Sequence, residues 1–80
     1  MIIDTYTLTM HYRSGGKVVK EGLELIDLYD PGVRYPGTGE RPVSIHLSPA
    51  PPESILNEVV GTLRCKLMPG VPKGQVTYGN

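Results

Sequence analysis

The sequence predicts a small α+β domain, in which an antiparallel sheet of four or five strands is covered by one short helix. Three observations support this class: an alternating N-terminal segment followed by paired glycines, a helical pattern of apolar residues beyond residue 52, and a length of 80 residues. A chain this short buries only about 60% of its unfolded surface, so residues 1–80 are expected to form a single domain. An all-β fold, with no helix longer than one turn, is the alternative.

An N-terminal β-hairpin, with strands at 2–13 and 17–29, is the clearest pattern in the chain. The first strand places Ile2, Tyr6, Leu8, Met10 and Tyr12 on one face, and Ile3, Thr5, Thr7, Thr9 and His11 on the other. Period-2 spacing of β-branched and aromatic residues is typical of a half-buried strand. Gly15 and Gly16 then supply the backbone angles of a tight turn. A bulge is expected near Gly22, where the second strand alternates less cleanly.

Prolines and glycines divide the middle of the chain. Asp30-Pro31-Gly32 predicts a turn, because proline presets φ and glycine tolerates the left-handed region. A loop is expected from Val33 to Pro42, and a short strand at 43–47. Residues 48–52 hold three prolines and are expected to form a rigid connector, since proline cannot donate a hydrogen bond to a sheet.

The last third of the chain contains the expected helix, near 52–61. Its apolar residues recur at helical spacing, namely Ile55, Leu56, Val59, Val60 and Leu63. Proline at the first turn and Glu53 beside it suit a helix start. Residues 62–68 alternate like a strand, and a strand is the favoured interpretation; one continuous helix to Leu67 is the alternative. A turn and a short edge strand at 75–78 complete the chain.

The apolar core predicted from composition is thin. Apolar residues make up 39% of the chain, and the single cysteine rules out an intramolecular disulfide. A core of this size stabilises a domain by about 3–5 kcal/mol unless something adds to it. We therefore expect a homo-oligomer or a partner-bound protein. Thr5, Thr7 and Thr9 form a flat, uncharged, β-prone face, and this face is the predicted self-association surface, by sheet-to-sheet packing or by edge pairing between chains.

The charge balance and the hydropathy of the chain exclude several classes of partner. Eight basic and eight acidic residues give a net charge of zero, without the basic excess that a binder of long nucleic acid normally carries. No run approaches the ~20 apolar residues that cross a bilayer, so no membrane association is expected. The lone thiol and an N-terminus unlike an export signal favour a cytoplasmic protein.

The loop between residues 33 and 42 is the candidate binding site. Its predicted binding residues are Arg34, Tyr35, Gly37, Thr38, Gly39 and Arg41. The arginines offer planar forks for phosphate or carboxylate, the tyrosine ring suits stacking on a base, and the glycines allow close backbone approach. The spacing matches neither the phosphate-binding loop nor the dinucleotide fingerprint. The alternative is a plain connector, in which these residues only turn the chain.

Catalytic and metal-binding groups are scarce in this chain. His11, His46 and Cys65 lack a third ligand or a carboxylate at ligand spacing, so surface histidines are the expected interpretation. Cys65 alternates with Leu63 and Leu67 and is predicted to point inward as a structural thiol. Glu24, Asp27 and Asp30 do not follow a calcium-loop pattern. No catalytic residue, metal or cofactor is predicted.

These observations favour a small non-enzymatic interaction protein, oligomeric, that blocks or sequesters a partner protein. Small inhibitors and accessory proteins of viral or mobile-element origin have this character. The alternative is a binder that sequesters a phosphate-bearing molecule, such as a nucleotide, in the loop that runs from Arg34 to Arg41. An enzyme ranks last, because too few proton-transfer groups are present to share the work.

Overall fold

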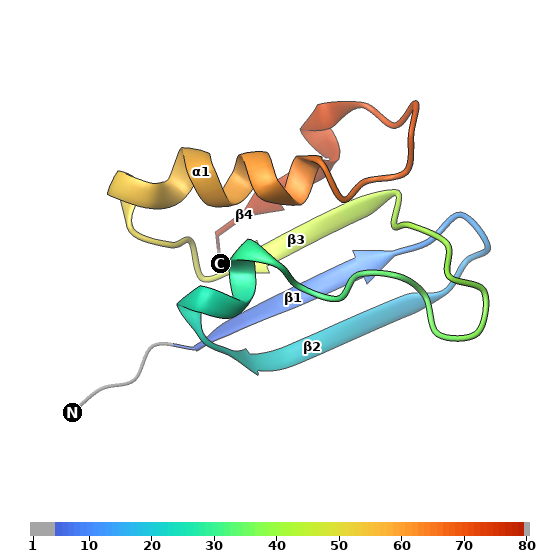
Figure 1. Cartoon of the computed structure of the whole chain (residues 1–80), viewed down its shortest axis with the longest axis horizontal. Coiled ribbons are helices and arrows are strands. Elements are labelled where there is room, and N and C mark those ends of the chain that lie inside the picture. The colour runs from blue at the N-terminus through green and yellow to red at the C-terminus, as the bar shows by residue number, and fades with distance from the viewer. Residues whose placement is uncertain (1–4, 80) are drawn as a thin grey trace.

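A four-stranded sheet with one α-helix packed on one of its faces forms the body of the protein (Figure 1). The computed structural model describes residues 5–79. The strands are β1 (Tyr6–His11), β2 (Lys17–Leu23), β3 (Ser44–Ser48) and β4 (Val76–Tyr78), in the spatial order β2-β1-β3-β4. The helices are α1 (Glu53–Arg64) and two 3-10 helices, η1 (Leu25–Tyr29) and η2 (Lys73–Gln75). The predicted α+β class is confirmed, and the all-β alternative is wrong.

The N-terminal hairpin is confirmed, together with the bulge near Gly22. Tyr6 pairs with Leu23 and Leu8 with Lys20, so β2 carries one residue more than β1 between these two pairs. Gly22 takes a φ of 70° there, which glycine adopts without strain. The N-terminal end of the expected first strand, residues 2–4, lies outside the described residues.

The expected extent of the second strand, 17–29, is wrong. The strand ends at Leu23, and the chain turns into η1. The Asp27 carboxylate accepts a hydrogen bond from the Glu24 amide at 2.9 Å, while the Asp27 amide donates to the Glu24 carbonyl at 3.0 Å. This local capping competes with continued pairing to β1, and η1 buries Leu28 completely.

The sheet is mixed, which corrects the expected antiparallel sheet. β1 runs antiparallel to both of its neighbours, whereas β4 runs parallel to β3, with Ile45 beside Val76 and Leu47 beside Tyr78. The parallel pairing follows from α1, which carries the chain back along the sheet before β4 begins (Figure 1). The predicted edge strand near 75–78 is confirmed as β4, at one edge of the sheet.

The predicted strand at 62–68 is wrong, and the helix continues to Arg64 instead. Its buried residues, Val59, Val60 and Leu63, follow helical spacing across Gly61. The continuous-helix alternative also extends too far, because Cys65 to Leu67 lie in turns. The inward position predicted for Cys65 depended on that strand and is also wrong, because the Cys65 side chain is exposed. None of the helices within residues 5–79 is long and apolar enough to cross a membrane.

The core lies between the sheet and the layer formed by α1, η1 and the segment after η1. Its completely buried members include Leu8 and Met10 of β1, Ile45 and Leu47 of β3, and Val59 and Leu63 of α1. The predicted inner face of the first strand is confirmed, with Tyr6 and Tyr12 also buried. No helix packs on the opposite face within the described residues, and we call this surface the open face of the sheet (Figure 1).

Candidate functional site

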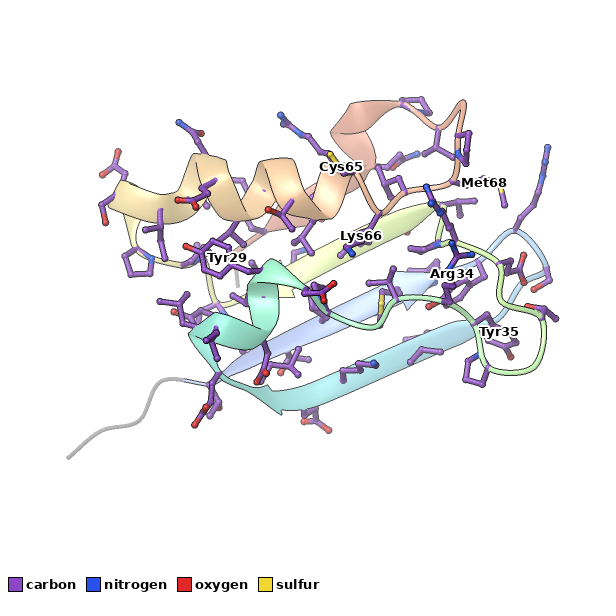
Figure 2. The ribbon with its side chains drawn as sticks, viewed as in Figure 1. Tyr29, Arg34, Tyr35, Cys65, Lys66 and Met68 are labelled. Carbon is purple, nitrogen blue, oxygen red and sulfur yellow. The ribbon has the colours of Figure 1, made fainter. Side chains whose placement is uncertain are left out.

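Four cationic side chains surround one hollow on the helix side of the sheet. This basic hollow has a volume of about 330 Å³ and is lined by Lys20, Pro31, Gly32, Val33, Arg34, Arg41 and Lys66. Its lining comes from β2, from the segment after η1, from the end of the predicted binding loop and from the turn after α1. Figure 2 shows Arg34 and Lys66 on neighbouring segments in front of the strands.

Buried anchors hold the segment from Pro31 to Val43 across β1 and β2. The side chains of Pro31, Val33 and Pro42 are buried. The Tyr12 hydroxyl donates a hydrogen bond to the Val33 carbonyl. The Val43 amide donates to the His11 carbonyl at 2.8 Å, and the Met68 amide donates to the Pro42 carbonyl at 2.9 Å. These contacts fix both ends of the loop, and so they also fix the positions of Arg34 and Arg41.

The middle of the loop closes on itself. The Tyr35 amide donates to the Glu40 carbonyl at 2.9 Å, and the Gly39 amide donates to the Tyr35 carbonyl at 2.8 Å. Gly37 and Gly39 take φ angles of 92° and 73°, which this tight turn requires. The Gly39 amide is therefore engaged within the loop, and Gly37, Thr38 and Gly39 lie outside the lining of the basic hollow.

Tyr35 is packed against the β1–β2 hairpin and does not line the basic hollow. Its ring lies tilted at 56° against the Tyr12 ring, with 4.8 Å between the centroids. A Cβ atom at Gly16 would lie 2.5 Å from the Cε1 atom of Tyr35, so the ring sits directly over this glycine. The half-buried ring therefore holds the loop to the hairpin, outside the basic hollow.

The cationic groups of the basic hollow are partly engaged by neighbours. The Arg34 Nη1 atom donates to the Gly39 carbonyl at 2.8 Å, which leaves other donors of the guanidinium free. Lys66 pairs with Asp30 at 3.0 Å, and the Asp30 side chain is 90% exposed. The Lys20 Nζ atom would lie 3.1 Å from a Cβ atom at Gly32, so this glycine leaves room for the ammonium group. Within residues 5–79, no ion-pair partner is found for Arg41.

Sequence reasoning placed Arg34 and Arg41 at a binding site but missed Lys20 and Lys66. Lys20 carried a signal, because it lies opposite Leu8 on the inner face of the sheet, where an apolar residue is expected. No sequence pattern around Lys66 indicated a binding role, since the position of Lys66 beside the basic hollow depends on where α1 ends.

His11, His46 and Cys65 do not come together. The two histidines lie on the open face of the sheet, where the His46 Nδ1 atom is 2.7 Å from the Thr77 hydroxyl. Cys65 is exposed after α1, on the other side of the sheet (Figure 2). Among residues 5–79, no group of three or more His, Cys, Asp or Glu side chains is arranged to hold a metal ion.

The predicted self-association residues lie on or beside β1. Thr7 and Thr9 are half-buried on the open face, and Thr5 is exposed just before the strand. β1 is paired on both sides, by β2 and by β3. Pairing of its edge with another chain, one of the two modes expected for these threonines, is therefore excluded for Tyr6–His11.

No family model, no curated protein and no solved structure matches this chain.

Proposed function

We propose that this chain is a non-enzymatic binding protein that sequesters a phosphate-bearing small molecule in the basic hollow. The observation that carries the proposal is the convergence of Lys20, Arg34, Arg41 and Lys66 on one hollow, in a chain whose net charge is zero. Half of the eight basic residues line this hollow. Interspersed surface charges alone would not concentrate in this way, so the hollow is a local positive field.

The size and the donor groups of the basic hollow suit a small phosphate ester. Small-molecule sites range from about 300 to 1,000 Å³, so a hollow of about 330 Å³ takes a ligand at the small end of this range. The guanidinium groups offer bidentate geometry for phosphate oxygens, and the two ammonium groups act as point charges. Val33 and Pro31 add apolar surface for the body of the ligand.

The composition of the lining favours binding over chemistry. Among the described residues, those that line the basic hollow contribute cations, prolyl, glycyl and valyl groups, but no histidine, cysteine, hydroxyl or carboxylate group; the Asp30 carboxylate, paired with Lys66, lies outside this lining. General acid–base and nucleophilic mechanisms draw mainly on the groups that this lining lacks. A free, exposed Cys65 is in keeping with the reducing cytoplasm, where we place the protein.

Titration calorimetry with inorganic phosphate, pyrophosphate and AMP tests this proposal. The wild-type chain is expected to bind pyrophosphate or AMP, with an affinity that falls as the salt concentration rises. The double variant R34A/R41A is expected to lose more than tenfold in affinity, because loss of a desolvated charged contact costs about 2–5 kcal/mol. Arg→Lys variants are expected to rescue only part of this loss.

Arg13 provides the matched control, since it is an exposed arginine outside the basic hollow. Arg13→Ala is expected to bind like the wild type. Equal affinities of R34A/R41A and the wild type, with both variants folded by circular dichroism, would show that the basic hollow is not the binding site.

A second candidate function is blockage of a partner protein's surface. The observation in its favour is Ile26, an aliphatic side chain on η1 that is 75% exposed. It lies five residues before Pro31, which lines the basic hollow. Native mass spectrometry of the chain purified from its own cells distinguishes the two functions. A co-purifying small anion supports sequestration, whereas a stoichiometric complex that depends on Ile26 and survives R34A/R41A supports blockage.

A further inference from the structure

Strand β2 forms one edge of the sheet and offers a short, self-complementary segment. Among the strands of residues 5–79, in the order β2-β1-β3-β4, β2 neighbours β1 alone (Figure 1). Lys17, Val19 and Glu21 of β2 are exposed, and Val19 is 46% exposed, one of the largest values for an apolar side chain in residues 5–79. Unpaired edge strands are templates for pairing with another chain.

The hairpin hydrogen bonds show which backbone groups of β2 face outward. The Tyr12 amide donates to the Gly16 carbonyl at 3.0 Å, which marks a hydrogen-bonded position at the turn. In an antiparallel ladder, every second residue pair is hydrogen-bonded. Tyr12 and Gly16 form such a pair, so the pairs two and four residues farther along, Met10 with Val18 and Leu8 with Lys20, are hydrogen-bonded as well. Val18 and Lys20 therefore direct their backbone groups toward β1. The amides and carbonyls of Lys17 and Val19 therefore face the open edge, and Glu21 holds the next alternate position, directly before the bulge at Gly22.

We propose that two copies of this chain associate through antiparallel pairing of their β2 edges, around a two-fold axis at Val19. This register joins the outward groups of Val19 to those of the second copy's Val19. It also places Lys17 opposite the second copy's Glu21, and Glu21 opposite its Lys17. The two sheets then form one continuous eight-stranded sheet, with both helices on the same side.

Charge complementarity identifies a second copy as the occupant of this edge. Within one chain, Lys17 and Glu21 lie about 14 Å apart along the strand, too far to pair with each other. In the proposed register each finds an opposite charge directly across the interface, and cross-strand pairs of this kind are stabilising. A strand lacking this charge pattern would leave the Lys17 ammonium group unpaired, which disfavours other partners.

The bulge at Gly22 limits this pairing to residues 17–21, because the regular ladder ends there. An interface of this length lies in the class of weak, concentration-dependent contacts. We therefore expect a dimer in rapid exchange with the monomer, visible between micromolar and millimolar concentrations.

Charge-reversal variants test the register by sedimentation equilibrium. A homodimer of Lys17→Glu brings together two glutamate–glutamate pairs across the axis, and one of Glu21→Lys brings together two lysine–lysine pairs, so each single variant is expected to dimerise about tenfold more weakly. The swapped variant K17E/E21K restores both attractions and is expected to dimerise like the wild type. An equimolar mixture of the two single variants is expected to form a heterodimer, because both pairs are complementary in it.

Thr9→Lys is the comparison variant, since Thr9 lies beside Val19 on the open face: the added charge disturbs contacts through this face but leaves the outward backbone groups and the charged side chains of the β2 edge unchanged. It is expected to dimerise like the wild type. A wild-type chain that remains monomeric at millimolar concentration would overturn the proposal. So would a dimer that Thr9→Lys dissociates while both single charge reversals leave it intact, because association would then run through the open face.

Discussion

Tyr12 and Val33 are joined by a hydrogen bond between two buried residues that lie far apart in the sequence, with the tyrosine hydroxyl as the donor. Tyr12 follows the central strand of the sheet, and Val33 opens the loop that places Arg34 and Arg41. Both side chains are buried, so neither group can exchange its partner for bulk water. This single contact connects the stability of the sheet to the shape of the basic hollow.

Tyr12→Phe is therefore expected to destabilise the protein. The variant keeps the buried ring but leaves the Val33 carbonyl without its donor, which costs about 1–3 kcal/mol. Urea denaturation measured by circular dichroism gives this difference as a lower midpoint. Tyr35→Phe is the control, because the contacts of Tyr35 involve its ring and backbone; its unfolding free energy should stay within about 0.5 kcal/mol of the wild-type value. Equal midpoints for the two variants would show that the Tyr12 hydrogen bond adds nothing.

The stability of the protein is expected to fall at alkaline pH. Burial, assisted by the nearby Glu40 carboxylate and by Tyr35, raises the pKa of Tyr12 above its ordinary value of 10.0. The unfolded chain then releases the tyrosine proton at lower pH than the folded chain does, so this contribution is complete below about pH 10 and is lost as pH rises through the folded-state pKa. Unfolding free energies measured between about pH 8 and pH 11.5 test this dependence. Tyr12→Phe should show a smaller loss over the same range.

Two glycine substitutions are expected to change stability in opposite directions. Gly16→Ala places a Cβ atom 2.5 Å from the Tyr35 ring, so the ring must move and stability should fall by about 1–3 kcal/mol. Gly61→Ala meets no atom within 4 Å inside α1 and should raise stability by about 0.5–1 kcal/mol. Thermal denaturation of both variants measures the difference. A Gly16→Ala variant as stable as the wild type would mean that Tyr35 is not held against the hairpin.

Removing the Asp30 carboxylate is expected to strengthen anion binding. Asp30 pairs with Lys66 from a highly exposed position, so Asp30→Asn frees a cation of the basic hollow at little cost in stability. Pyrophosphate affinity should rise severalfold in calorimetry at low salt, and the gain should shrink as salt is added. The double variant D30N/K66A should not show the gain. A gain that persists in this double variant would assign it to another cause.

The parts of the fold that sequence predicted well are those decided by neighbouring residues. The hairpin, the bulge at Gly22 and the last edge strand each follow from local alternation and from glycine placement. The segment 62–68 has both periodicities, and packing decided between them: Leu63 belongs to the buried face of α1, while β4 takes the place beside β3. The end of β2 was mispredicted because Asp27 caps the Glu24 amide, a contact that alternation does not reveal.

The candidate site was predicted in part for the same reason. Arg34 and Arg41 stood out in a loop rich in glycine, and both line the basic hollow. Lys20 and Lys66 reach it only because β2 and the end of α1 meet the loop in three dimensions. Tyr35, read as a stacking surface, instead packs on Tyr12. A sequence pattern shows which groups are present, whereas long-range packing decides which of them share a site.

The central position of β1 has a consequence for how the chain acquires its structure. The β1–β2 hairpin involves only residues 6–23, yet its apolar side is covered by β3 and by α1, which follow much later in the chain. During synthesis, Leu8 and Met10 therefore remain uncovered until α1, which ends at Arg64, has emerged from the ribosome. A chain cut before residue 53 would lack α1 and leave the apolar face of β1 exposed, so it is expected to aggregate more readily than residues 1–80.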